Sequence, residues 1–285
     1  MSKRTNSIGR HLPTSGGLKK TLQKAKEQGC ETVQIFVSNP QGWADPVPRP
    51  DREAFVEGTR EMRLSPVVVH AKYLINLASS KEEQRERSVR TLARELVAAG
   101  ALGADLVVVH SGSYGDSDEK RGMARLVESL LQVRELTDGD GAAEPVIENS
   151  VGAGTQLCST FETLADAAER AGVRICVDTA HAFVAGYDLS TLKSTRRVAG
   201  ELQEALDGRI ALFHLNDARN GLGSHRDGHC RIGEGRIPTE SWTEFFAALP
   251  GIPVVMETPY DSTEVDAEQV RLVKELAGGL PNSSE

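Results

Sequence analysis

The sequence predicts an α/β protein, a single (β/α)8 barrel with its active site at the carboxyl ends of the strands. Eight short apolar runs rich in β-branched residues recur along the chain, and segments of helical periodicity lie between most of them. Six of the runs also end in a histidine or a carboxylate, namely His70, His110, Glu148, Asp178, His214 and Glu257. Because a barrel brings the carboxyl ends of its strands to one rim, these side chains are expected to face a common centre.

The expected strands and helices alternate in the order that βα units require. The strand-like runs span 7–12, 32–37, 65–71, 105–110, 145–149, 174–179, 210–215 and 253–258. Between the first six runs, apolar residues recur at three- and four-residue steps, which predicts helices over 17–29, 51–63, 81–100, 119–133 and 160–172. Gly29, Gly100 and Gly172 are expected to end three of these helices, since glycine is favoured just past a helix.

A doubly wound open sheet is the structural alternative to the barrel. Such a sheet would centre its site on a crevice at a switch point, instead of recruiting ligands from six successive strands, so the barrel is favoured. The longest stretches without a helical pattern, at 38–50, 111–117 and 216–239, all follow strands. We expect them on the ligand-bearing face, as candidate substrate clamps or as variable surface.

Composition restricts the class of protein. The formal net charge is −8, with 33 Lys and Arg against 41 Asp and Glu, so no global positive field points to nucleic acid or to an anionic membrane. A nucleic-acid substrate is not excluded, because bound cations can supply local positive charge. The 4 cysteines form no CxxC pair, and no run resembles a signal peptide or a membrane span. We therefore expect a cytoplasmic monomer with a disordered tail at 1–7, a barrel domain at 8–277 and a C-terminal tail at 278–285.

Histidines and carboxylates at the strand ends form a candidate metal site. A histidine at a strand end is more often a hydrogen-bonded structural residue, but packing three imidazoles and three carboxylates on one rim without cations would cost several kcal/mol. These groups are the ligands of zinc-type hydrolytic sites. His181, three residues past one strand end, and the alternating Asp227 and His229 extend the set to nine, more than one ion needs. His11 and His225 are expected to form hydrogen bonds behind the ligands or, for His225, to contact substrate.

Long segments of the chain resemble the signatures of endonuclease IV-type apurinic/apyrimidinic endonucleases. The segments are SIGRHLPTSGGL, HAKYLINLAS, ENSVGAG, DTAHAFVAGYD, HLNDA, RDGHCRIGEG and METP, and they extend over nearly the whole chain. The resemblance implies a (β/α)8 barrel that carries three zinc ions, for which manganese or iron can substitute. By position, the first ion would be held by His70, His110 and Glu148. Glu148 would bridge to a second ion held by Asp178, His214 and Glu257, and the third would be held by His181, Asp227 and His229.

The resemblance also implies a reaction and a substrate. The expected activity is hydrolysis of the phosphodiester on the 5′ side of an abasic site in double-stranded DNA, leaving a 3′-hydroxyl, together with removal of groups that block 3′ ends. The chemistry would be an in-line attack of water assisted by metal ions. Glu148 is the first candidate to orient or deprotonate that water, and Glu257 is the second.

Residues expected to contact DNA match the family less completely. Tyr73 and Leu74 match side chains that family members insert into the base stack, and the third such position, often arginine, is Gln41 here. Gly228 also stands where arginine is common, and Arg226 and Arg231 flank it. Either DNA binding is intact despite these differences, or duplex affinity or substrate preference has changed. Lys72 is expected to contact phosphate or to be a solvated lysine.

Two other functions remain open at this point. The same barrel with metal ligands at its rim serves sugar isomerases and epimerases, which need one or two ions and have no use for a third cluster. A non-catalytic module that binds damaged DNA is the other alternative, but it would have little reason to retain nine ligands. The third cluster therefore favours the nuclease.

Overall fold

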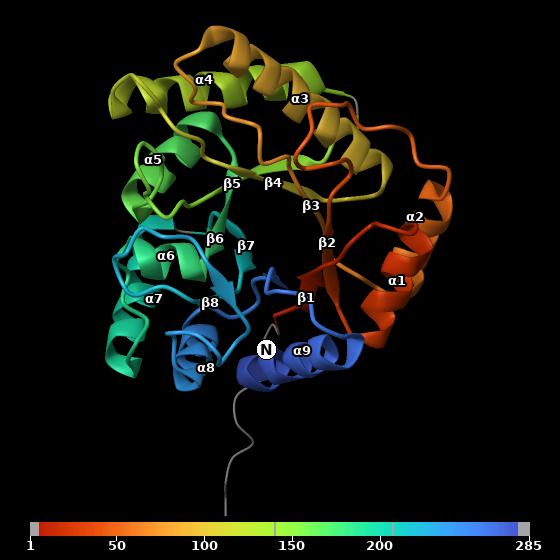
Figure 1. Ribbon diagram of the computed structural model, residues 1–285, viewed down its shortest axis with the longest axis vertical. Coiled ribbons are helices and arrows are strands. Elements are labelled where there is room, and N and C mark those ends of the chain that lie inside the picture. The colour runs from red at the N-terminus through yellow and green to blue at the C-terminus, as the bar shows by residue number, and fades with distance from the viewer. Residues whose placement is uncertain (1–5, 140, 207, 279–285) are drawn as a thin grey trace, which may run out of the picture.

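Eight parallel strands close into a barrel, in the order β1-β10-β7-β6-β5-β4-β3-β2 (Figure 1). The computed structural model describes residues 6–139, 141–206 and 208–278. The barrel strands are β1 (Ile8–His11), β2 (Thr32–Ile35), β3 (Val67–His70), β4 (Leu106–His110), β5 (Glu144–Glu148), β6 (Arg174–Asp178), β7 (Ile210–His214) and β10 (Val254–Met256). Each of these strands lies within a predicted run, except that β5 begins one residue earlier. The predicted fold class is confirmed.

Helices surround the strands as an outer ring (Figure 1). They are α1 (Leu18–Glu27), α2 (Arg52–Glu61), α3 (Glu82–Ala101), α4 (Glu119–Thr137), α5 (Phe161–Ala171), α6 (Thr179–Ala185), α7 (Leu192–Leu206), α8 (Thr239–Ala248) and α9 (Thr263–Gly278). The first five correspond to the five predicted helical segments. The last four were not predicted from the sequence, and α6 begins directly after Asp178, in the segment that carries His181.

The glycine caps were predicted correctly at two of three positions. Gly29 and Gly172 follow α1 and α5 with φ of 69° and 64°. Gly100 instead lies inside α3, and Gly103, with φ of 70°, is the residue that turns the chain. Gly100 is needed for a different reason, because a Cβ atom there would lie 2.1 Å from the carbonyl oxygen of Gly141. The glycine thus permits a close backbone approach.

Apolar side chains fill the barrel below its polar rim. The inner cluster consists of Val68, Leu106, Val108, Val146, Cys176, Ala211, Leu212 and Val255. A larger core packs the outer faces of the strands against the helices. The barrel is therefore a packed core without a pore, and its open, functional end is the one where the strands terminate in histidines and carboxylates.

The barrel includes part of the predicted N-terminal tail. Asn6 is buried and its Nδ2 donates to the carbonyl oxygen of Ile252 at 2.7 Å, while the Ser7 carbonyl accepts from Val254 N. The predicted tail over 1–7 is thus wrong for these two residues, because backbone at the base of β10 binds them. The rest of that tail lies outside the described residues, as does all of the predicted C-terminal tail except Gly278, which ends α9.

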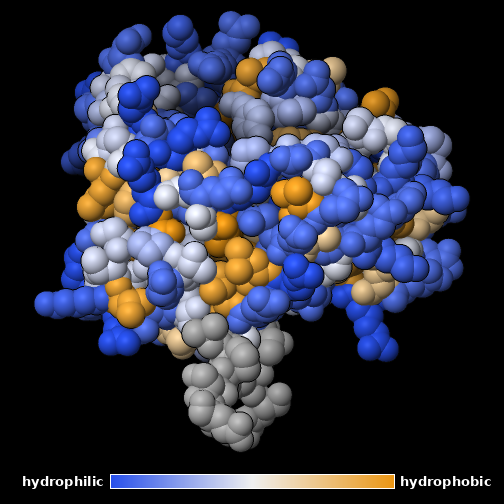
Figure 2. Space-filling view, turned by 60° about the horizontal axis from the view of Figure 1, so that its bottom comes forward, coloured by the Kyte–Doolittle hydropathy of each residue, from blue (hydrophilic) through white to orange (hydrophobic). Residues whose placement is uncertain are grey.

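The surface is mainly hydrophilic on the face that Figure 2 shows, with separate small groups of hydrophobic residues between the charged ones. Among the helices of the described ranges, none combines the length and the apolar character that crossing a membrane requires.

Candidate metal centre

The rim of the barrel brings the strand-end side chains together. His70, His110, Glu148, Asp178 and His214 are the last residues of β3 to β7, and Glu257 directly follows β10. Adjacent parallel strands are in register at these positions, with His110 beside Glu148 and Asp178 beside His214. The sheet register therefore places two pairs of the predicted strand-end ligands side by side, and His70 and Glu257 reach the same rim from the ends of β3 and β10.

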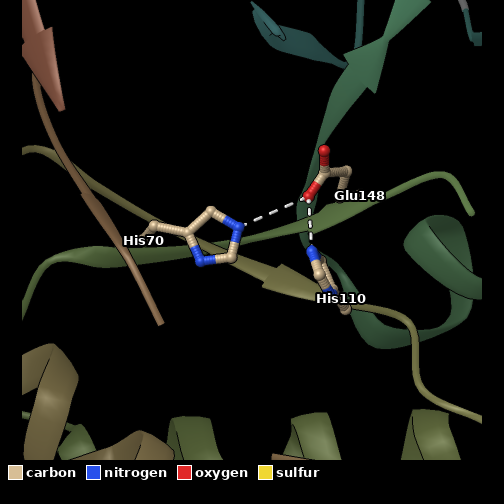
Figure 3. A group of neighbouring side chains, drawn as sticks. All are labelled: His70, His110 and Glu148. Atoms are coloured by element: carbon tan, nitrogen blue, oxygen red, sulfur yellow. Dashed lines mark ion pairs between the residues drawn. The ribbon is translucent and has the colours of Figure 1, made fainter. Parts of the chain in front are cut away.

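Figure 3 shows the first cluster, in which two imidazoles face one carboxylate oxygen. The Oε2 atom of Glu148 lies 3.7 Å from His70 Nε2 and 3.4 Å from His110 Nε2, both longer than an ordinary N–H···O hydrogen bond. This Oε2 atom is buried and has no hydrogen-bond partner among the described residues. His70 Nδ1 donates to the Ala71 carbonyl at 2.7 Å, so Nε2 is the ring nitrogen that faces Glu148.

A second cluster uses the other oxygen of Glu148. His214 Nδ1 lies 2.8 Å from Glu148 Oε1 and 3.2 Å from Glu257 Oε2. Glu148, Asp178, His214 and Glu257 each offer one atom that could bind a metal ion, and these four atoms lie within 4.8 Å of one another. Asn216 holds two of the carboxylate residues in place, because its Nδ2 donates to Asp178 Oδ2 at 2.6 Å and its Oδ1 accepts from Glu257 N.

The third cluster combines α6 with the long loop after β7. Asp178 caps α6 by accepting from His181 N at 2.7 Å, and this turn directs the His181 ring to the rim. His181 Nε2 and His229 Nε2 lie 3.5 and 3.4 Å from Asp227 Oδ1, and His229 Nε2 lies 3.6 Å from Asp178 Oδ2. His181 Nδ1 donates to the carbonyl of Asn149 at 3.0 Å, so its Nε2 faces the carboxylate.

The loop that supplies Asp227 and His229 is anchored by a buried carboxylate. Asp217 accepts hydrogen bonds from the backbone N–H groups of Ala218, Gly233, Gly235 and Ile237. Within the loop, β8 (Asp217–Ala218) and β9 (His229–Cys230) form a short antiparallel pair. The absence of a helical pattern over 216–239 did not predict this pair. The pairing holds His229 on the barrel rim.

The histidines and carboxylates of the clusters shift one another's pKa values. Burial would raise the pKa of Glu148, but His214, His70 and His110 outweigh it and hold this pKa well below the usual range. Burial likewise opposes ionisation of Glu257, yet His214 and His70 lower its pKa to about 2. The pKa of His214 is raised well above its ordinary value, since burial is outweighed by Cys176, Glu257 and Glu148. The raised pKa of His214 therefore favours a protonated imidazole beside these carboxylates in the metal-free protein, whereas burial lowers the pKa of His110 to about 4.

The donor atoms fit divalent metal ions. Imidazole nitrogens and carboxylate oxygens converge from separate strands, their spacings leave room between them, and Glu148 Oε2 and His229 Nε2 are buried without hydrogen-bond partners among the described residues. A cation at these points would satisfy both atoms.

Residues that sequence analysis missed lie directly behind the ligands. Gln34 contacts His214 and Glu257, and Asn149 and Asn216 bind the backbone or carboxylate of Asp178. The only signal for Gln34 was a polar residue inside an otherwise apolar strand. His11 Nδ1 lies 3.0 Å from Gln34 Nε2, behind the predicted ligands, whereas His225 is exposed and its Nδ1 donates to the Val151 carbonyl.

A cavity of about 380 Å³ opens beside the clusters. Its walls include Tyr73 and Leu74 together with His110, Glu148 and Asp227. Tyr73 is 53 % exposed. Its ring centroid lies 5.4 Å from that of His70. An aromatic ring next to the clusters is positioned to contact a bound substrate.

The other predicted DNA contacts lie in different surroundings. Gln41 and Arg226 are exposed, and Arg231 pairs with Glu234 and Asp261. At Gly228 the packing is tight, since a Cβ atom would lie 2.9 Å from Asn220 Nδ2.

Both expectations for Lys72, a phosphate contact and a solvated side chain, are wrong. Its side chain is buried, and its ammonium group binds Ser38 Oγ and the Asn39 carbonyl and lies 3.6 Å from Glu95. These contacts direct the ammonium group into the protein, away from the surface where DNA would lie.

Comparison with known proteins places the chain in a family. A family model described as xylose isomerase-like TIM barrel matches residues 22–278. The chain is 35 % identical over 283 residues to a probable endonuclease 4 of Cenarchaeum symbiosum, covering 95 % of this chain and 99 % of the relative. The crystal structure of endonuclease IV from Thermus thermophilus superposes with a TM-score of 0.85 at 31 % identity, covering 95 % and 99 % of the two chains. The chain belongs to the endonuclease IV family.

Membership of the endonuclease IV family confirms the assignment to the nucleases, a class of hydrolases. A D-tagatose 3-epimerase-like protein has the same fold, with a TM-score of 0.72 at 20 % identity over 95 % of this chain and 98 % of the other. That likeness concerns the barrel scaffold alone.

Proposed function

We propose that this member of the endonuclease IV family is a DNA repair enzyme that hydrolyses the phosphodiester 5′ to an abasic site and clears blocked 3′ ends. The observation that carries the proposal is the arrangement of nine histidines and carboxylates as three adjoining clusters, in a chain that matches endonuclease IV over nearly its whole length. We further propose that the enzyme acts as a cytoplasmic monomer.

Each cluster would hold one zinc ion, with manganese or iron as substitutes. The first would use His70, His110 and Glu148, the second Glu148, Asp178, His214 and Glu257, and the third His181, Asp227 and His229. When bound, the ions would make a water molecule acidic near neutral pH and neutralise charge on the phosphate and on the departing 3′-oxygen.

Glu148 and Glu257 would act as ionised carboxylates. The low pKa of each keeps it charged at neutral pH, so each accepts hydrogen bonds and favours a ligand role. Glu148 lies between the first two clusters, where its oxygens would orient the attacking water in line with the scissile bond. Glu257, on the open side and 16 % exposed, is the second candidate for this role.

Recognition would use the cavity beside the clusters. An abasic nucleotide lacks a base, so its sugar and phosphate can leave the duplex at low cost and enter a small pocket. Tyr73 and Leu74 would fill the gap left in the stack, because they line the pocket mouth and Tyr73 is exposed. Gln41 would contact the same part of the duplex through a neutral side chain.

The decisive experiment uses a duplex oligonucleotide with one central abasic analogue. We expect incision on the 5′ side of the lesion, lost on chelation and restored by zinc. Glu148→Gln should fold normally and lose more than about 100-fold in turnover, beyond the range for an outer partner of a metal ligand. Glu144→Gln, on the same strand but paired with Arg174 at the surface, is the matched control and should keep its activity.

Absence of incision by the zinc-loaded parent protein would overturn the proposal. Cleavage by Glu148→Gln at the parent rate would overturn the role given to Glu148. A sugar-epimerising activity would favour the alternative function of the barrel, although that function leaves the third cluster unexplained.

A further inference from the structure

Gln34 is a polar side chain buried inside the barrel. It lies on β2, where the exposed fraction of the residue is 0 %, and it is surrounded by strands whose other inward side chains are mostly apolar. Burial of an amide is unfavourable unless its donors and acceptor are satisfied. Gln34 satisfies them through groups that belong to the metal centre or adjoin it.

The contacts of the Gln34 amide define its orientation. Its Oε1 lies 2.9 Å from His214 Nε2, and its Nε2 lies 2.6 Å from Glu257 Oε1 and 3.0 Å from His11 Nδ1. The reverse placement of the amide would set its oxygen against the Glu257 carboxylate and leave both without a proton. Gln34 Nε2 therefore donates to Glu257, and Gln34 Oε1 accepts from His214.

This orientation fixes the tautomer of His214. With the Nε2 proton donated to Gln34, the ligand atom is Nδ1, which faces Glu148 and Glu257. His70 and His181 have the opposite arrangement, because a backbone carbonyl binds Nδ1 in each and Nε2 faces the carboxylates. His214 is the one of these three whose tautomer depends on a replaceable side chain.

We propose that Gln34 is a positioning residue for the second cluster, which sets two of its ligands for one divalent cation. Through one amide it directs the His214 Nδ1 lone pair inward and holds Glu257 Oε1, so that Oε2 remains free to face the same point. The inference rests on the proposed function for the identity of the ion, zinc, but it concerns binding and not cleavage. Partners behind a metal ligand typically contribute about 10- to 100-fold to metal affinity.

The test is zinc binding by Gln34→Met and Gln34→Glu. Methionine keeps the length of the side chain and removes both hydrogen bonds, whereas glutamate keeps an acceptor for His214 and loses the donor to Glu257. We expect one of the bound ions to be held about 10- to 100-fold more weakly in each variant, measured by competition with a chromophoric chelator and by metal counting. The remaining ions should be retained, and cleavage should recover at saturating zinc.

Thr32→Val is the matched control, because Thr32 is also buried on β2, two residues from Gln34, and its hydroxyl binds the Pro66 carbonyl. It should leave zinc affinity unchanged even if it lowers the melting temperature. If Gln34→Met does not fold, Gln34→Glu decides.

Zinc affinity within about twofold of the parent in the folded Gln34 variants would overturn the inference, since it falls below the range for a positioning partner. Selective loss of one ion in a protein that never cleaves abasic DNA would support the inference while overturning the proposed function.

Discussion

Glu148 joins the first two clusters, and each of its oxygens faces a different one. Oε2 faces His70 and His110, while Oε1 faces His214, all at the bottom of the rim where the carboxylate is fully buried. If each of these clusters holds a cation, as proposed, this shared carboxylate would couple the occupancy of the two sites. Binding of a cation to such a cluster also requires that protonated imidazoles lose their protons.

The pH dependence of zinc binding at the third cluster follows from His181. Burial would lower its pKa, but Asp178 and Asp227 outweigh burial and raise it to about 10 in the metal-free protein. Zinc needs the neutral imidazole, so binding releases this proton at any pH below about 10. The pKa of Asp227, at about 2 because His181 lies against it, adds no proton near neutrality.

We therefore expect the affinity of the third ion to rise about tenfold per pH unit between about pH 6 and pH 8. Chelator competition at several pH values measures this slope. His181→Asn should abolish binding of the third ion, and with it the pH-dependent part of zinc binding. An affinity of the third ion that stays constant with pH would contradict the assigned ligand.

Two loops and one helix are joined by a buried ion pair. Lys72, in the loop after β3, binds Ser38 and Asn39 in the loop after β2, and Glu95 of α3 binds both Ser38 Oγ and Lys72 N. These loops also carry Tyr73 and Gln41. The buried Lys72–Glu95 pair therefore holds in place the loops that are proposed to contact DNA, although neither charged group lies on the surface.

Removal of one partner should be costly. Lys72→Met leaves the Glu95 carboxylate buried and unpaired, so we expect a loss of about 3–5 kcal/mol in the free energy of unfolding, measured by urea denaturation. The double variant Lys72→Met with Glu95→Gln should recover most of this loss. Equal stability of the parent and Lys72→Met would show that the pair is not buried in solution.

Elements could be predicted where the sequence pattern alone decides them. The eight strands and five helices follow from apolar periodicity, and six of the nine proposed ligands follow from their positions at strand ends. The helix α6 was missed because its seven residues begin directly after the last residue of β6, and Asp178 is both a proposed ligand and the cap of the helix. The role of Gln34 could not be read from the sequence, because its contacts with β7 and β10 appear only when the barrel closes.

The whole molecule carries a net charge of −8, and two of the basic residues proposed to meet DNA already lie against carboxylates of the protein. Lys72 is buried and Arg231 is engaged with Glu234 and Asp261. Arg226 is exposed, on the loop that carries the third cluster. Metal ions in the clusters would then supply most of the positive charge that attracts a phosphate.

Salt dependence of DNA binding tests this charge distribution. We expect Arg226→Gln to reduce the slope of log affinity against log salt by about 1, as for one lost phosphate contact. Lys72→Arg, which keeps a buried cation, should leave the slope unchanged. The measurement is the affinity for an uncleavable abasic duplex at several salt concentrations, and an unchanged slope for Arg226→Gln would exclude a phosphate contact.

The proposed ligands are positioned in two different ways, some by the strands of the barrel and others by the loop after β7, which Asp217 anchors. The ligands at the strand ends are set by the sheet itself, so a change in their spacing would require a change in the barrel. Asp227 and His229 are delivered by a hairpin that one carboxylate fastens to the rim through four backbone N–H groups. Substitutions within that hairpin would therefore change how tightly the proposed third ion is held without changing the strand ends that carry the first two clusters.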